Sequence, residues 1–181
     1  MGAGKSTVGK QLAQRLQRPF IDTDKELEAR CGVSVAEIFA VEGEAMFRER
    51  EAKLIAELTL REGIVLATGG GAALRPENRT NLKNRGTVFY LNADPYDLFQ
   101  RTRYDKNRPI LQGTNILQKL IDLHAIRHPL YLETAHHLIT TGRPSARDVV
   151  EKILQTIAPP SQEDSTLEYV CLEPLVLAAQ T

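Results

Sequence analysis

The 181-residue sequence predicts an α/β fold in which helices cover both faces of a parallel sheet. Strand-like apolar runs alternate with helical stretches up to about residue 157, the pattern of parallel strands joined by crossover helices. A glycine-rich string, GAGKST, opens the first helix, and carboxylates or glycines follow two later strands. Because ligands of open α/β sheets bind beyond the carboxyl ends of the strands, these groups are expected at one edge.

The composition indicates which binding partners and which cellular location to expect for the protein. Lys plus Arg and Asp plus Glu are balanced at 23 each, so bulk charge gives no reason to expect nucleic acid. The longest apolar runs are far shorter than the roughly 18 residues of a membrane helix, and the N-terminus lacks the apolar region of a signal peptide. The two cysteines show no metal-ligand spacing. We expect a cytoplasmic protein that binds neither nucleic acid nor membranes.

The first helix is expected over residues 5–16, where apolar side chains recur four residues apart. PFIDTD, residues 19–24, is expected to be a short strand whose period of two places Asp22 and Asp24 on one face at its end. Two short helices and a longer amphipathic helix are expected next, over 25–31, 34–43 and 44–62. GIVLATGGG, residues 63–71, indicates a buried strand that runs into a tight glycine loop or a close ligand approach.

The second half of the chain continues the alternation. Helices are expected over 76–85, 94–105, 116–135 and 145–157, and strands over 87–93 and 137–141. Residues 106–115 are basic, contain proline and glycine, and lack periodicity, which indicates a loop. Ser145 and Asp148 match an N-terminal capping box. Residues 158–181 do not continue the alternation of helices and strands. We therefore expect a kinase-like domain over 1–157 and a flexible tail without assigned function.

GAGKST is the strongest chemical signal in the sequence. In a phosphate-binding P-loop, glycines let backbone N–H groups face the phosphates, and the helix N-terminus adds favourable partial charge. Lys5 would reach the outer phosphates, and Ser6 would hold Mg²⁺. The alternative is a glycine-rich turn that caps a helix by chance, because so short a string is not rare.

The later strand ends favour the P-loop interpretation. Asp22, Asp24 and the glycines 69–71 come from separate segments, yet all are expected at the edge where the P-loop lies. Beside a P-loop, one carboxylate can serve the Mg²⁺ shell and the other the hydroxyl of a phosphate acceptor. In isolation, DTD would more often be a solvated turn.

Arginines are the third element of the expected site. Phosphoryl transfer is catalysed mainly by positioning and charge stabilisation, so it needs a cation near the γ-phosphate. Arg108 in the basic loop is the candidate, provided that this loop is a lid rather than solvated surface. Arg48 and Arg127 lie on expected helices, and only an anionic acceptor would require both, because guanidinium pairs bidentately with carboxylate.

Taken together, these strings resemble the shikimate kinase family. GAGKST, DTD, FRERE, ATGGGA, the RP of the basic loop and RHPLYLETA occur in the order and spacing of that family, from residue 1 to about 157. The resemblance implies a monomeric P-loop kinase with a shikimate-binding helical region at about 24–62 and a lid at about 103–115. Such an enzyme transfers the γ-phosphate of ATP to the 3-hydroxyl of shikimate, on the route to chorismate and the aromatic amino acids.

The resemblance also implies roles for individual residues. Those expected to bind ATP are Gly2, Ala3, Gly4, Lys5, Ser6, Thr7, Arg108 and, in a looser match near the adenine, Arg143. Those expected to bind Mg²⁺ are Ser6 and Asp22, the latter in the outer shell of the metal. Those expected to bind shikimate are Asp24, Arg48, Gly70 and Arg127, with the two arginines on its carboxylate. The expected catalytic groups are Lys5, Arg108 and Asp24, the last as a base.

The resemblance is incomplete at the N-terminus. In the family, a hydrophobic strand and a first P-loop glycine precede the position of Met1, so we expect this sheet to lack its central first strand and the true protein to begin further upstream. Two neighbouring strands would then have exposed edges with unpaired N–H and C=O groups. Two alternative functions remain: another small-molecule P-loop kinase such as gluconate kinase, and a truncated nucleotide-binding module without catalysis.

Overall fold

The computed structural model of the chain describes residues 3–102, 115–141, 144–157 and 175–177. Within these ranges it has a five-stranded sheet with strand order β1–β2–β5–β3–β4. β1 pairs with β2 and β3 pairs with β4 in parallel, whereas β5 runs antiparallel to both of its neighbours. The strands are β1 (Phe20–Asp22), β2 (Val65–Ala67), β3 (Thr87–Asn92), β4 (His137–Thr140) and β5 (Leu175–Leu177).

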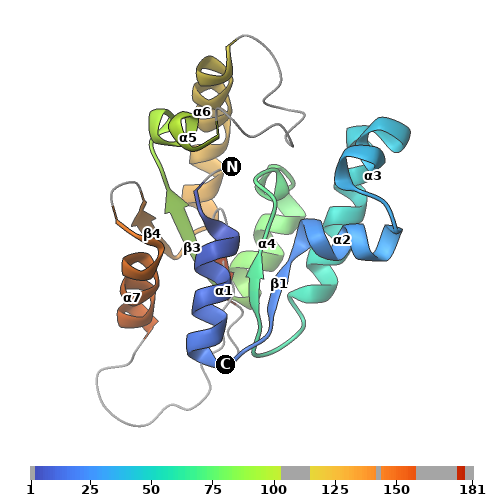
Figure 1. The fold of residues 1–181 in the computed structure, drawn as a ribbon. Coiled ribbons are helices and arrows are strands. Elements are labelled where there is room, and N and C mark those ends of the chain that lie inside the picture. Colours follow the sequence, from blue (N-terminus) through green and yellow to red (C-terminus); the bar gives the residue numbers. More distant parts are fainter. Residues whose placement is uncertain (1–2, 103–114, 142–143, 158–174, 178–181) are drawn as a thin grey trace.

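Helices cover both faces of this sheet, as the alternating pattern predicted (Figure 1). α1 and α7 pack side by side on one face, and α4 packs against β3, α3 and α6 on the other. α2 packs on α3 beside the β1 edge, and α5 packs on α6. The helices are α1 (Lys5–Leu16), α2 (Thr23–Cys31), α3 (Val35–Leu58), α4 (Pro76–Arg85), α5 (Pro95–Thr102), α6 (Ile116–Thr134) and α7 (Ala146–Ile157), with a 3₁₀ turn, η1 (Ala72–Leu74).

The hydrophobic core fixes the first helix to the sheet. Leu12 of α1, Leu66 of β2 and Phe89 of β3 are fully buried in one cluster, together with Ile153 of α7. Each such side chain contributes about 1.5 to 3 kcal/mol when it leaves water. The start of α1 is therefore held at a defined place on the sheet edge.

The end of β1 differs from the prediction. The strand stops at Asp22, whose carboxylate accepts hydrogen bonds from the backbone N–H groups of Asp24 (3.1 Å) and Lys25 (3.5 Å) and so caps α2. Aspartate at an N-cap satisfies N–H groups that have no partner inside the helix, and this outweighs the continuation of a strand. Asp24 therefore lies in the first turn of a helix and not on the face of a strand.

Two other local predictions are confirmed. α3 contains a break at Gly43, whose φ of 82° and ψ of 169° are not helical, where the two predicted pieces 34–43 and 44–62 meet. The capping box of α7 is present, because the backbone N–H of Ser145 donates to Asp148 (2.9 Å) and the backbone N–H of Asp148 donates to the Ser145 hydroxyl (3.2 Å).

The middle of the sheet contains an antiparallel strand that the sequence did not predict. Val176 of β5 lies in register between Leu66 of β2 and Val88 of β3. The inner edges of β2 and β3, expected to be exposed, are thus paired by a strand from the C-terminal tail. Residues 175–177 of the tail form this strand, and the rest of the tail, for which flexibility was expected, lies outside the described residues. A buried backbone without hydrogen-bond partners is costly, which explains why the position is occupied.

Candidate functional site

The N-terminus of α1 forms the phosphate end of the candidate site. Gly4 caps the helix with a φ of 86°, a left-handed conformation that glycine adopts readily. Lys5 is the first helical residue, and no acidic side chain occupies the first turn. The N–H groups of this turn and the positive end of the helix dipole therefore point to a place suited to an anion.

Ser6 and Asp22 meet at this helix start. The Ser6 hydroxyl donates a hydrogen bond to the Asp22 carboxylate at 2.8 Å, although the two residues belong to different elements. The sequence predicted that the P-loop and the DTD string would converge on one sheet edge, and the structure confirms this convergence.

Asp24 lies against the glycine loop that follows β2. A methyl group built on Gly69 would come within 2.9 Å of the Asp24 carboxylate, so only glycine allows this approach. Burial and the neighbouring charge of Asp22 raise the pKa of Asp24, and the charges of Lys5 and Arg48 oppose that shift. A half-buried carboxylate with a raised pKa, near the lysine of the P-loop, is chemically suited to accept a proton from an alcohol.

Arg48 of α3 is held from three sides. Its guanidinium donates to the buried Glu51 carboxylate at 2.8 Å and to the exposed Glu44 carboxylate at 3.2 Å. The guanidinium carbon lies 5.1 Å from the ring centre of Phe47, and the fork lies face-on against Gly71, where any Cβ would collide with it. The glycine run thus allows the close approach that the sequence predicted, and the group that approaches is a side chain of the protein.

Glu51 is a member of the site that the sequence analysis missed. Its side chain is fully buried, and burial raises its pKa to about 7 against the opposing charge of Arg48. One carboxylate oxygen pairs with Arg48, and the other has no hydrogen-bond partner among the described residues. The signal was present in the sequence, because Glu51 interrupts the apolar stripe of α3 three residues after Arg48.

Arg127 reaches the site from α6. It is only 9% exposed, and together with Ala3, Tyr90 and Tyr131 it lines a cavity of about 40 Å³. Tyr131 donates from its hydroxyl to the backbone carbonyl of Gly70 at 2.5 Å, which connects α6 to the glycine loop. The structure therefore brings the segments of Arg127, Gly70 and the P-loop together.

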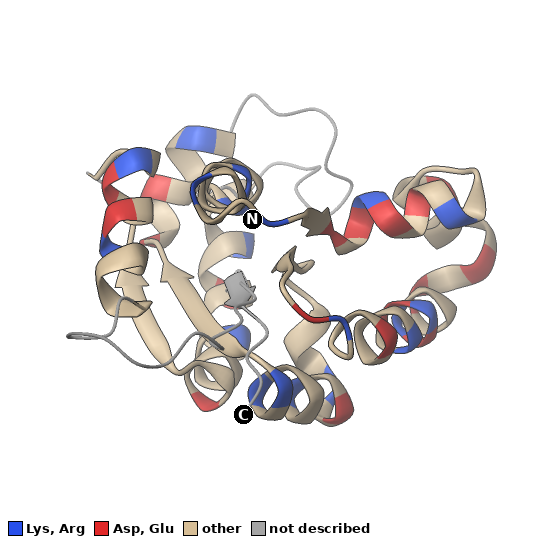
Figure 2. Cartoon of the chain, turned by 90° about the horizontal axis from the view of Figure 1, so that it is seen from below, with Lys and Arg blue, Asp and Glu red and all other residues tan. Residues whose placement is uncertain are grey.

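The remaining predicted residues are placed as follows. Gly2, Arg108 and Arg143 lie outside the described residues, and Thr7 is exposed on α1. Over the described part of the ribbon, acidic and basic residues are interspersed and form no extended patch of one sign (Figure 2). The charges that matter for a ligand are therefore the local groups around the P-loop and the glycine loop. Within the described ranges, the structure contains no helix long and apolar enough to cross a membrane.

A helix that begins at GAGKST on the edge of an α/β sheet, with a serine and an aspartate paired beside it, defines a P-loop phosphotransferase fold. Comparisons with known proteins give the family. The family model described as shikimate kinase matches residues 1–158. The chain belongs to the shikimate kinase family.

Individual relatives agree with this assignment. The chain is 58% identical to a shikimate kinase of Ralstonia nicotianae over 157 residues, covering 87% of this chain and 83% of that protein. It is 59% identical to a shikimate kinase of Burkholderia pseudomallei, covering 87% and 85%. The solved structure of a shikimate kinase from Acinetobacter baumannii in complex with shikimate is 52% identical, has a TM-score of 0.84, and covers 87% of this chain and 88% of its own.

Proposed function

We propose that this chain transfers the γ-phosphate of ATP to the 3-hydroxyl of shikimate, forming shikimate 3-phosphate and ADP. One observation carries the proposal: Arg48 lies against Gly71 of the glycine loop beside Asp24, at the sheet edge where the P-loop helix begins. Arg127, from a different helix, lines a cavity with Ala3 and with Tyr131, whose hydroxyl bonds the same loop at Gly70. An acceptor with one carboxylate and several hydroxyls matches two guanidinium groups and a carboxylate. The proposal includes a monomeric enzyme, which the resemblance to the family implies.

The nucleotide would bind at the N-terminus of α1. The N–H groups of the first helical turn and the Lys5 ammonium would hold its phosphates. The donor set fits a magnesium ion, because the Ser6 hydroxyl and the Asp22 carboxylate are hard oxygen ligands that already lie 2.8 Å apart. When bound, Mg²⁺ neutralises charge that develops on the transferred phosphate. The described residues include no cluster of three or more His, Cys, Asp or Glu side chains, and a magnesium ion shared with phosphates does not require one.

The acceptor would bind between the glycine loop and the two arginines. The Glu44 contact of Arg48 is on the exposed side, so a ligand carboxylate can replace it while Glu51 keeps hold of the guanidinium. Arg127 would contact the same carboxylate from α6, and the backbone of Gly70 would contact the ring of the acceptor.

Asp24 would act on the reacting hydroxyl. The 3-hydroxyl proton passes to the Asp24 carboxylate, the oxygen forms a bond to the γ-phosphorus, and the bond to the β-phosphate oxygen breaks to release ADP. The raised pKa of Asp24 favours its role as proton acceptor. Lys5 would stabilise the charge on the phosphates, and Arg108 is proposed for the same task from the predicted lid.

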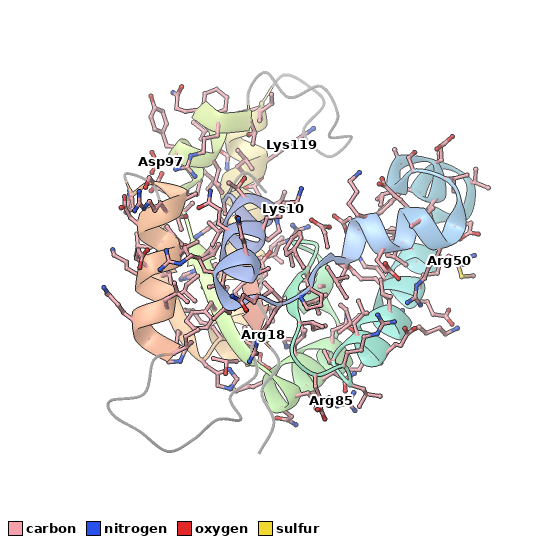
Figure 3. All side chains as sticks on the ribbon, turned by 60° about the horizontal axis from the view of Figure 1, so that its bottom comes forward. Lys10, Arg18, Arg50, Arg85, Asp97 and Lys119 are labelled. Carbon is pink, nitrogen blue, oxygen red and sulfur yellow. The ribbon has the colours of Figure 1, made fainter. Side chains whose placement is uncertain are left out.

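The test is ADP release with shikimate and with a panel of other hydroxy acids and polyols, including gluconate. Shikimate should be the preferred acceptor, and chelation of Mg²⁺ should abolish turnover. Asp24→Asn should lower kcat by about 10²- to 10⁴-fold and keep ATP binding, whereas Asp97→Asn on α5 (labelled in Figure 3) should have no effect. Binding of ATP without turnover on any acceptor would favour the non-catalytic alternative, and faster turnover of gluconate would favour another small-molecule kinase.

The arginines give a second test of the acceptor. Arg48→Ala should raise the KM for shikimate and leave the KM for ATP unchanged. Arg50→Ala is the matched control, because Arg50 follows two residues later on the outer side of α3, where it pairs with Glu42 (Figure 3). If Arg48→Ala leaves the KM for shikimate unchanged, the carboxylate assignment is wrong.

A further inference from the structure

Tyr131 is a buried polar residue to which the mechanism above gives no task. Its side chain is 7% exposed, and its hydroxyl donates to the carbonyl of Gly70, 61 positions earlier in the chain, at 2.5 Å. This contact joins α6 to the loop after β2, two elements that meet only through tertiary packing.

Arg127 lines the same cavity as Tyr131. The two residues are four apart on α6 and therefore lie on one face of the helix. Burial raises the pKa of Tyr131 to about 12, while the charge of Arg127 and its hydrogen bond to the hydroxyl oppose the shift. The hydroxyl stays protonated at neutral pH, so it can donate to the Gly70 carbonyl and accept from the guanidinium at the same time.

The ring of Tyr131 is held independently of its hydroxyl. It packs on the ring of Tyr90 in β3 with 5.0 Å between centroids, and Ala73 of η1 belongs to the same buried cluster. Tyr90 directs its own hydroxyl elsewhere, to Asn92 and His128, each at 2.9 Å. The cluster thus contains two buried tyrosines, of which only Tyr131 touches the glycine loop.

We propose that Tyr131 is a positioning residue for the acceptor, because its hydroxyl sets the separation between the Gly70 backbone and the Arg127 guanidinium. This inference rests on the proposed function, in which Gly70 and Arg127 bind opposite parts of one carboxylated acceptor. Neither group is rigid alone: one is in a glycine run, and the other is at the end of a long side chain. A single buried hydroxyl that bonds Gly70 and belongs to the same helix face and cavity lining as Arg127 reduces the entropy that acceptor binding would otherwise have to remove.

The test compares Tyr131→Phe with Tyr90→Phe in the full chain. Both variants keep an aromatic ring in the cluster and each loses one hydroxyl. Tyr131→Phe should raise the KM for shikimate and its dissociation constant, measured by calorimetry without ATP, by about 3- to 10-fold, the range for loss of a buried hydrogen bond. It should leave the KM for ATP unchanged and kcat within about twofold. Tyr90→Phe should lower the thermal midpoint and change both shikimate constants by less than twofold, because its hydroxyl bonds Asn92 and His128 and not the glycine loop.

The outcomes distinguish a positioning role of Tyr131 from a packing effect and from failure of the proposed function. Equal shikimate constants in the wild type and Tyr131→Phe would overturn the positioning role and leave the proposed function intact. A similar rise in both variants would also overturn it, because the effect would then come from packing of the cluster. A wild-type chain that neither binds nor phosphorylates shikimate would overturn the proposed function together with this inference.

Discussion

Gly71→Ala is the most informative single substitution in the site. Gly71 has a φ of −91° and a ψ of −8°, which alanine adopts without strain. A Cβ at this position would collide with the face of the Arg48 guanidinium. Any effect of the substitution must therefore act through displacement of Arg48 and not through the backbone.

The structure sets the size of the effect. A displaced Arg48 loses a charge-assisted hydrogen bond to the substrate carboxylate, worth about 1.5 to 3 kcal/mol, which corresponds to a rise of about 10- to 100-fold in the KM for shikimate. It also leaves the buried Glu51 without its cation, which lowers the free energy of unfolding by about 3 kcal/mol at pH 8. At pH 6 the loss should be smaller, because a carboxyl with a pKa of about 7 takes up a proton there.

The assay measures steady-state KM values for shikimate and ATP by ADP release, together with urea unfolding at pH 6 and pH 8. Gly32→Ala is the control, because it should lower stability without changing substrate binding. Gly32 ends α2 with a φ of 71° and has no atom near its missing Cβ, so alanine there should cost about 1 to 2 kcal/mol of stability without any change in KM. A folded Gly71→Ala protein with an unchanged KM for shikimate would refute the reasoning.

Three further predictions concern Glu51, Arg127 and β5. The pKa of Glu51 is raised from 4.5 to about 7, so the native state holds a proton that the unfolded state has lost, and stability should fall by about 3 kcal/mol as pH rises from 4.5 to 7. Glu51→Gln should flatten this slope in urea unfolding at several pH values, and an equal slope in both proteins would contradict the prediction. Arg127→Lys keeps the charge but loses the planar fork, so it should raise the KM for shikimate about 10-fold in the same assay, and an unchanged value would count against contact with the carboxylate. Val176→Pro removes a backbone donor from the middle of the sheet and should lower the unfolding free energy by about 1 to 3 kcal/mol relative to Gln162→Pro elsewhere in the tail; equal stability of the two would show that β5 does not support the sheet.

The sequence by itself determined the order of helices and strands up to residue 157 and the edge at which the site lies. Both depend on local properties: the spacing of apolar residues, the glycines at a helix start, and the rule that parallel strands end together. For this reason the convergence of the segments of Ser6 and Asp22, 16 residues apart, on one sheet edge could be predicted. The end of β1 could not be predicted. An aspartate that caps a helix and an aspartate within a strand cannot be distinguished from the sequence, because the difference is whether helix N–H groups lie around the carboxylate.

Only the tertiary structure decided how the site is held together. Glu51 pairs with Arg48, and Tyr131 bonds Gly70. Both contacts depend on how α3 and α6 pack against the glycine loop. The place of β5 depends in the same way on the edges of β2 and β3, which pair with a segment about 110 and about 90 residues later in the chain. Local patterns carry no information about such partners, because burial and distance arise only when distant segments share one core.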